Sequence, residues 1–238
     1  MSYRDIRRNP SSDPVKDREF LDSTQVKHLR EGVLFDIELM ERSPRSFRRG
    51  QGFKPGNEAV WTSTLKPASE ISPFEDWDED DPQGMTTSWA QDADYFYAYG
   101  EDAALFSIEP WARVFHIRNV PDQQRLMAKY GYTNRNAPDE GGIDWDQMLI
   151  DGWDGVHLAL DYFKNWRDDG WRPREWLGMT FWNLWLDGWD AESTAWLNPS
   201  ALIFKGLARV DSEGMVTVRN PSRLSRLYSR AWRNVKKE

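Results

Sequence analysis

The stretch GWDAESTAWLNP, residues 188–199, joins two acids to a short apolar run that is typical of a β-strand. Asp190 and Glu192 stand two positions apart at the start of this run. Because residues i and i+2 of a strand point to the same face, both carboxylates are expected on one side of a sheet edge, where they repel each other. This is an unfavourable way to begin a strand, and it indicates that something binds at the two acids.

The composition of the whole chain limits the classes of protein to which this strand can belong. Its 238 residues suffice for one large domain or for a domain with extensions. The formal charge of −8 argues against general affinity for nucleic acid or anionic membrane. The absence of cysteine excludes disulfides and suits a reducing compartment, and no apolar stretch resembles a membrane span or a signal peptide. We therefore expect a soluble, cytoplasmic protein.

Fourteen tryptophans, many of them beside acids or glycines, are the most unusual part of the composition. Their irregular spacing excludes a propeller or a solenoid, because those folds require a fixed period. Two interpretations of the indoles remain. Most can fill a core and donate their N–H to a nearby carboxylate, and a few can line a cleft as stacking surfaces for a nucleobase or a nicotinamide ring.

The chain divides into three expected segments. Residues 1–58 form a helical N-terminal extension and a basic connector, with the helix inside residues 13–40 because a proline start precedes apolar residues at helical spacing. Residues 59–210 form the core, and residues 211–238 form a basic amphipathic helix. The core contains seven strand-like runs, at residues 59–64, 84–89, 104–109, 112–117, 155–160, 193–197 and 201–210. Helices are expected between them at residues 90–100, 121–132 and 143–152. This mixed order predicts an α+β fold.

The common catalytic motifs are absent from the sequence. It has no Walker loop, no dinucleotide-binding G-x-G-x-x-G after a strand, no H-E-x-x-H and no nucleophile elbow. The three histidines, His28, His116 and His157, are far apart in the chain. For His157 we expect a strand residue with a structural hydrogen bond rather than a metal ligand, so no metal site is predicted.

The order of elements from AVWTST through GMTTSWAQDADYFYAYG to DAESTAWLNP resembles that of the ADP-ribosyltransferase superfamily. In that family a strand carrying Arg or His is followed by a strand with a Ser-Thr-Ser-like triplet and a helix, and a late strand opens with an x-x-Glu element. The resemblance covers about residues 59–205 and implies a split β-sheet core. It also implies cleavage of NAD between nicotinamide and ribose, and transfer of ADP-ribose to a protein or nucleic-acid acceptor.

The resemblance assigns roles to particular residues. Glu192 takes the place of the catalytic acid, which stabilises the positive charge that develops on the ribose as nicotinamide leaves. Asp190 would orient or deprotonate the acceptor. Thr86, Thr87 and Ser88 correspond to the hydroxyl triplet. Together, the residues expected to bind NAD are Thr62, Ser63, Thr86, Thr87, Ser88, Tyr95 and Tyr97.

One departure from the family leaves the function open. The first core strand, AVWTST, offers Thr62 or Ser63 where the family has Arg or His, so Arg48 or Arg49 of the connector are candidates to replace that residue. Without a replacement, the alternative is a non-catalytic nucleotide-binding or protein-interaction module with an aromatic cleft. A purely structural interpretation also remains, in which Asp190 caps a turn and Glu192 is solvated.

Overall fold

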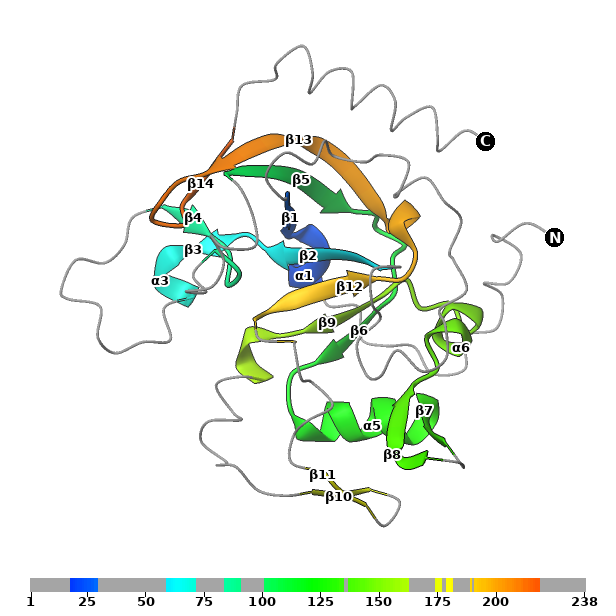
Figure 1. Cartoon of the computed structure of the whole chain (residues 1–238). Coiled ribbons are helices and arrows are strands. Elements are labelled where there is room, and N and C mark those ends of the chain that lie inside the picture. Colours follow the sequence, from blue (N-terminus) through cyan, green and yellow to red (C-terminus); the bar gives the residue numbers. More distant parts are fainter. Residues whose placement is uncertain are drawn as a thin grey trace.

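An eight-stranded sheet is the main element of the protein, seen in a computed structural model (Figure 1). Its strand order is β14-β13-β5-β1-β2-β12-β9-β6, and all neighbours are antiparallel except the parallel pair β6 and β9. With helices packed on this sheet, the chain is α+β, as predicted. The structure describes residues 18–29, 59–71, 84–90, 101–134, 137–162, 174–176, 179–181, 189 and 191–218.

The strands of the large sheet come from most of the described chain. In chain order they are β1 (Thr24–His28), β2 (Val60–Thr64), β5 (Asp102–Ile108), β6 (Val114–Ile117), β9 (Gly155–Leu158), β12 (Ser193–Trp196), β13 (Leu202–Val210) and β14 (Val216–Val218). Small two-stranded sheets are formed by β3 (Lys66–Pro67) with β4 (Met85–Thr86), β7 (Gly131–Asn134) with β8 (Ala137–Ile143), and β10 (Arg174–Trp176) with β11 (Met179–Phe181). The helices are α1 (Arg18–Asp22), α3 (Ala68–Ile71), α5 (Val120–Tyr130), α6 (Trp145–Ile150) and the 3-10 turn η3 (Pro199–Ala201).

The helices α5 and α6 confirm two sequence predictions, and their ends show why they form. Asn119 caps α5 by accepting the amide N–H of Asp122, and Asp144 caps α6 by accepting that of Gln147.

Each of the seven strand-like runs also contains a strand. The third expected helix, at residues 90–100, lies outside the described residues except for Ala90, which is in a turn.

The expected N-terminal helix is wrong over most of its described part. Only α1 is helical; the chain turns at Ser23 and continues as β1, which lies inside the sheet between β5 and β2. Gln25 and Val26 point to opposite faces of the sheet and are both fully buried. The pairing of β1 with its two neighbouring strands therefore outweighs the helical spacing of its residues. The strand β14 likewise falls within the segment 211–238 that was expected to be helical, so the sheet extends on both sides of residues 59–210. Residues 219–238 are outside the described part.

The strand β2 divides its pairing between two groups of strands. Val60, Trp61 and Thr62 pair with β12, whereas Ser63 and Thr64 pair with β1. The sheet therefore consists of one half built from β14, β13, β5 and β1 and another built from β12, β9 and β6, joined at β2 (Figure 1). This junction, the seam, is where the candidate site lies.

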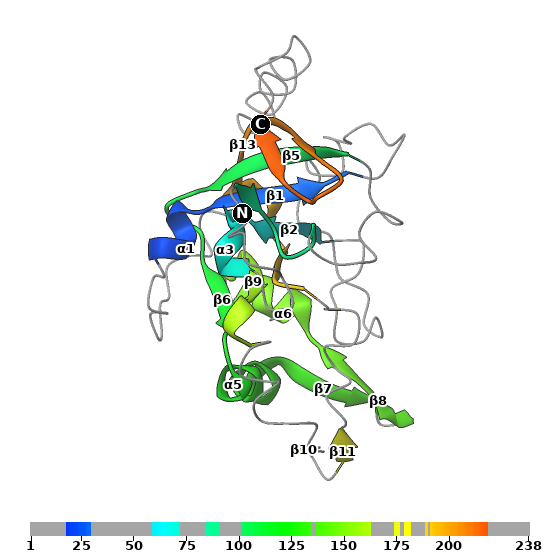
Figure 2. The same ribbon diagram turned by 90° about the vertical axis from the view of Figure 1, so that its left-hand side faces the viewer.

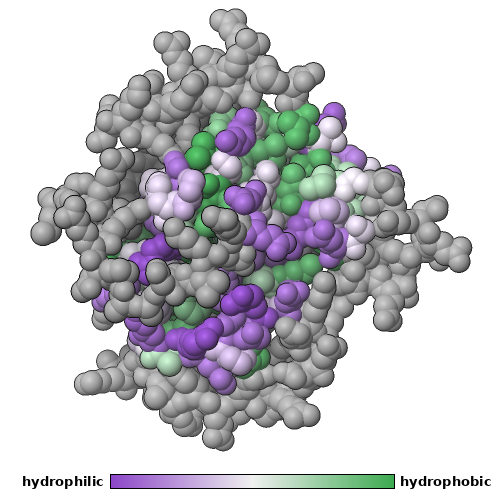
Figure 3. Space-filling model, turned by 180° about the vertical axis from the view of Figure 1, so that it is seen from behind, coloured by the Kyte–Doolittle hydropathy of each residue, from purple (hydrophilic) through white to green (hydrophobic). Residues whose placement is uncertain are grey.

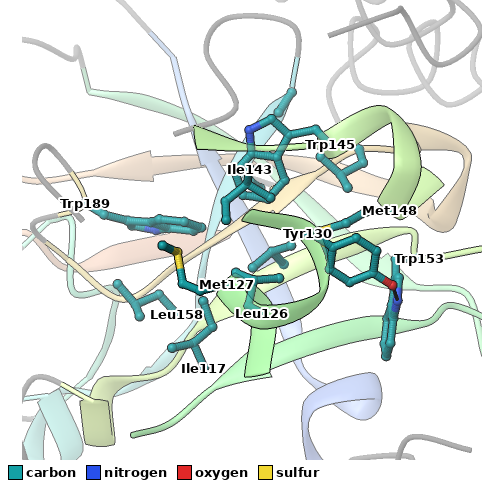
Figure 4. Packing of buried hydrophobic residues seen from close by; sticks show 14 of the residues in the cluster. Ile117, Leu126, Met127, Tyr130, Ile143, Trp145, Met148, Trp153, Leu158 and Trp189 are labelled. Carbon is teal, nitrogen blue, oxygen red and sulfur yellow. Dashed lines mark hydrogen bonds between the residues drawn. The ribbon is translucent and has the colours of Figure 1, made fainter. Parts of the chain in front are cut away.

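Apolar clusters cover both faces of the second half. On one face, α5 and α6 pack against β6, β9 and β12, and Figure 4 shows Leu126 and Met127 pointing toward Ile117 and Leu158. The indole N–H of Trp153 donates to the hydroxyl of Tyr130 at 2.8 Å in the same cluster. On the other face lies α1 (Figure 2). Its Phe20 belongs to a second cluster with Trp196, Phe106 and Phe204.

The surface of the described residues is mixed in character. On the side shown in Figure 3, apolar residues gather in the upper part, and hydrophilic residues form a band across the middle and lower parts. No helix in the described ranges is long and apolar enough to cross a membrane.

Asp154 fixes the mutual position of β6, β9 and β12. Its buried carboxylate accepts the amide N–H of Arg113 at 2.9 Å and the side-chain amide of Asn198 at 2.6 Å. We expect Asp154→Asn to lower the free energy of unfolding by about 1–3 kcal/mol, because the new NH₂ group must face one of these two donors. Urea denaturation of this variant and of the exposed control Asp161→Asn measures the difference, and equal stability of the two would contradict this role.

Candidate functional site

Glu192 lies directly before β12, at the seam between the two halves of the sheet. The expectation that it marks a sheet edge is wrong, because β12 runs between β2 and β9 in the interior. The side chain is 2 % exposed, so it is not a solvated surface acid either. A carboxylate is buried to this degree only when donors replace the water that it loses.

Four hydrogen bonds supply that replacement. Oε1 accepts the hydroxyl of Thr64 at 2.6 Å and Nε2–H of His157 at 2.7 Å. Oε2 accepts the backbone N–H of Thr64 at 3.1 Å and the hydroxyl of Ser63 at 3.0 Å, and Ser63 shares its one hydrogen with the backbone carbonyl of Glu192 at 2.8 Å. Burial by itself raises the pKa of Glu192, but the hydrogen bond and charge of His157, together with the bonds from Thr64, outweigh it and hold the pKa below its usual value. The site therefore presents an ionised carboxylate at neutral pH.

A directed chain of hydrogen bonds orients the Thr64 hydroxyl toward this carboxylate. It starts at the buried indole of Trp196, whose N–H can only donate, and which bonds to the Thr62 hydroxyl at 2.8 Å. Thr62 then donates to Oε1 of Gln25 at 2.7 Å, and Nε2 of Gln25 donates to Thr64 at 3.1 Å. Because each hydroxyl accepts on one side and donates on the other, the hydrogen of Thr64 is left for Glu192.

His157 is a buried residue of β9, and the prediction of a strand residue with a structural hydrogen bond is confirmed. Its second ring nitrogen lies 3.0 Å from Nδ1 of His116, on the parallel neighbour β6. The three groups form an uninterrupted row from Glu192 to β6.

A further histidine, His28, ends β1 on the other side of the seam. Its Nε2 is 2.8 Å from the hydroxyl of Thr87, and its ring lies 5.8 Å from that of Trp89. Burial, with a smaller contribution from the charge of Lys27, lowers the pKa of His28 to about 3. The ring is therefore neutral in the folded protein at physiological pH.

The structure brings part of the predicted triplet to Glu192. Ser88 donates to the backbone carbonyl of Glu192 at 2.9 Å, although 104 residues separate them. Thr87 contacts His28 instead, and Thr86 donates to the carbonyl of Gly214 at 2.6 Å. Of the residues named from the first core strand, Ser63 reaches the carboxylate and Thr62 belongs to the chain from Trp196.

The remaining sequence candidates lie outside the described residues. These are Asp190, Tyr95, Tyr97, Arg48 and Arg49. The acidic pair is thus described only through Glu192.

Sequence reasoning missed four residues of the site. Thr64 follows Ser63 directly in AVWTST, and its position in a contiguous Thr-Ser-Thr run was a usable signal. Gln25 and His28 were assigned to a helix, which hid their place on a strand next to that run. For His116 the sequence carries no signal, because its contact with His157 depends on the parallel pairing of β6 and β9.

Comparisons of the chain with protein-family models, with curated proteins and with solved structures found no match in any of the three. Within the described ranges, no group of three or more His, Asp or Glu side chains is placed to hold a metal ion. The chemistry that this site can carry out therefore follows from the geometry around Glu192.

Proposed function

We propose that the protein is an ADP-ribosyltransferase-like enzyme that cleaves NAD between nicotinamide and ribose and transfers ADP-ribose to a protein or nucleic-acid acceptor. One observation carries the proposal: an ionised glutamate at the start of a late strand is held by the hydroxyls of an earlier strand, β2. That earlier strand pairs with β1, which ends in His28. This is the order of histidine strand, hydroxyl strand and glutamate strand that the sequence resemblance implies.

The proposal assigns the hydroxyl triplet differently from the sequence. Thr62, Ser63 and Thr64 lie on the strand beside the histidine strand, and two of them bond to the Glu192 carboxylate. The hydroxyl of Ser88 donates to the backbone carbonyl of Glu192 and so also holds this glutamate in place. With His28 as the histidine of the first strand, Arg48 and Arg49 are no longer needed as replacements.

The chemistry follows from the charge of the carboxylate. As the bond to nicotinamide breaks, positive charge develops on the ribose ring, and an anion held close to that ring stabilises the transition state more than the ground state. Low exposure strengthens this interaction, because little water screens it. Asp190 keeps its proposed role of orienting or deprotonating the acceptor.

Two indoles near the seam suit the flat rings of NAD. Trp61 is two positions before Ser63 on β2 and is partly buried, with its ring 5.1 Å from that of Trp189. Trp89 follows Ser88 and packs on His28. Both rings can stack against a nicotinamide or an adenine.

Binding of NAD is therefore expected to quench tryptophan fluorescence at about 1 mM NAD, within the usual range of KM values. Trp61→Phe or Trp89→Phe should each remove part of the quenching, because these indoles lie beside the site. Trp111→Phe, in the turn after β5 and 37 % exposed, serves as the control and should leave it unchanged. If NAD gives neither quenching nor a thermal shift, the proposal fails.

A second candidate function, a non-catalytic nucleotide-binding module, is favoured by one feature of the same site. Both oxygens of Glu192 already accept bonds from the protein, so a ribose hydroxyl must displace one of these donors. Chromatographic measurement of nicotinamide release distinguishes the two functions. Quenching without release would support the binding module, and release would support the enzyme.

A further inference from the structure

Gln25 is a fully buried amide of β1 that lies beside the hydroxyls of β2. It is the Cα partner of Thr64 in the pairing of the two strands, and Thr62 lies two positions earlier on the same face of β2. Oε1 of Gln25 is 2.7 Å from the Thr62 hydroxyl, and Nε2 is 3.1 Å from the Thr64 hydroxyl. Both ends of the amide therefore contact the strand that holds Glu192.

A third contact joins the amide to the end of α1. Nε2 of Gln25 also lies 3.0 Å from the hydroxyl of Ser23, the residue that follows α1. Ser23 donates its own hydrogen to the backbone carbonyl of Phe20 at 2.7 Å, so toward Gln25 it accepts. The amide nitrogen carries two hydrogens, and Ser23 and Thr64 accept one each.

The indole of Trp196 decides which end of the amide faces Thr62. Its N–H can only donate and lies 2.8 Å from the Thr62 hydroxyl, so that oxygen accepts there. The hydrogen of Thr62 is then available for an acceptor, which is Oε1 of Gln25. The amide oxygen thus faces Thr62, and the amide nitrogen faces Ser23 and Thr64.

The reversed amide would make fewer hydrogen bonds. Nε2 of Gln25 would then face Thr62, and Oε1 would face the oxygens of Ser23 and Thr64. The hydrogens of both these hydroxyls are already donated elsewhere, that of Thr64 to Glu192 at 2.6 Å. One bond would replace three in a buried site, so the amide is held in the orientation that the structure shows.

We infer that Gln25 is a positioning residue for Glu192, because its Nε2–H bonds to the oxygen of Thr64 and so directs the Thr64 hydroxyl at the carboxylate. A hydroxyl that accepts one hydrogen bond also donates a stronger one, since the first bond polarises it. Gln25 therefore acts on the carboxylate through Thr64. The effect on turnover rests on the proposed function, whereas the orientation of the amide does not.

Proton NMR tests the inference without NAD. In the wild type, nuclear Overhauser effects from the Nε2 protons of Gln25 should be stronger to the side chains of Ser23 and Thr64 than to that of Thr62. This pattern can be measured even if a variant fails to fold. In Gln25→Met the hydroxyl proton of Thr64 should move upfield, because its bond to the carboxylate weakens. Stronger effects to Thr62 in the wild type, or an unmoved Thr64 signal in Gln25→Met, would overturn the inference.

Turnover of NAD provides the functional readout. Gln25→Met should lower kcat by about tenfold to a hundredfold, the range expected when a reacting group loses its position, with a smaller change in KM. Ser23→Ala is the matched control, because it removes the contact of the amide with the end of α1 and keeps the bond to Thr64. It should retain most of kcat. An unchanged kcat in Gln25→Met, or an equal loss in both variants, would overturn the inference while leaving the proposed function in place.

A double-mutant cycle separates action through Thr64 from general support of the fold. Thr64→Val keeps the shape of the side chain and removes the hydroxyl, so adding Gln25→Met to it should cause no further loss of kcat. A further loss as large as that of Gln25→Met alone would overturn the inference. A wild type that shows the expected Overhauser pattern but releases no nicotinamide would overturn the proposed function alone.

Discussion

Glu192→Gln is expected to lower the rate of nicotinamide release by about a hundredfold or more, the usual scale for losing one electrostatic contact to a transition state. The substitution keeps the shape of the side chain but removes the charge that opposes the positive ribose. Single-turnover measurement of NAD cleavage tests this directly. Glu70→Gln, an exposed residue of α3, is the matched control and should match the wild type.

The same variant should also lose stability, in contrast to what a sheet-edge acid would imply. All four bonds to the carboxylate are donated by the protein, so an amide NH₂ must face at least one donor. We expect the free energy of unfolding to fall by about 1–3 kcal/mol. Turnover must therefore be measured well below the melting temperature of the variant. Turnover at the wild-type rate in folded Glu192→Gln would rule out the catalytic role.

Acidification from pH 6.5 to pH 5 is expected to lower the free energy of unfolding by about 1.6 kcal/mol through His28 alone. Its pKa is about 3 in the folded protein and 6.5 as the ordinary value, so the unfolded chain binds more protons between these limits. The stabilisation is complete above pH 6.5 and is lost progressively as the pH falls toward 3. This window ends above pH 4.5, the ordinary pKa of Glu192. The lowered pKa of Glu192 also makes the free energy of unfolding fall on acidification, but at lower pH.

His28→Gln isolates this contribution, because an amide can still bond to the Thr87 hydroxyl but does not titrate. Urea denaturation of both proteins at several pH values gives the comparison. The wild type should show the steeper dependence, by about 1.1 kcal/mol per pH unit on average between pH 6.5 and pH 5. Parallel curves for the two proteins would show that His28 is not held neutral by burial.

Parts of the fold follow from local signals, and others depend on pairing that no local signal carries. The caps Asn119 and Asp144 mark α5 and α6, because capping depends on residues within one turn. The same reasoning fails for β1, because its residues have the spacing of a helix and form a strand through pairing with β5 and β2. Local sequence decides a conformation only where distant partners do not offer a better one.

The candidate site likewise combines a residue that local sequence indicates with contacts that depend on distant parts of the chain. Glu192 was found because an acid before an apolar run is unusual, yet its burial could not be predicted. The donors that make burial tolerable, Ser63, Thr64 and His157, lie 129, 128 and 35 residues away in the chain. The contact of Ser88 with Glu192 was anticipated only because the resemblance placed a hydroxyl segment beside the acid.

The seam at β2 also determines which residues position 192 can accept. There the backbone N–H of Thr64 donates to the side chain of Glu192. In a regular strand such an N–H donates to the backbone of the neighbouring strand. Every amino acid except proline carries that N–H, so no ordinary substitution at position 64 can relieve the requirement for an acceptor. A leucine or a lysine at position 192 would leave the donor unsatisfied whatever the rest of the site contained. The requirement for an acceptor at this position is thus imposed by the main chain of another strand, independently of any reaction.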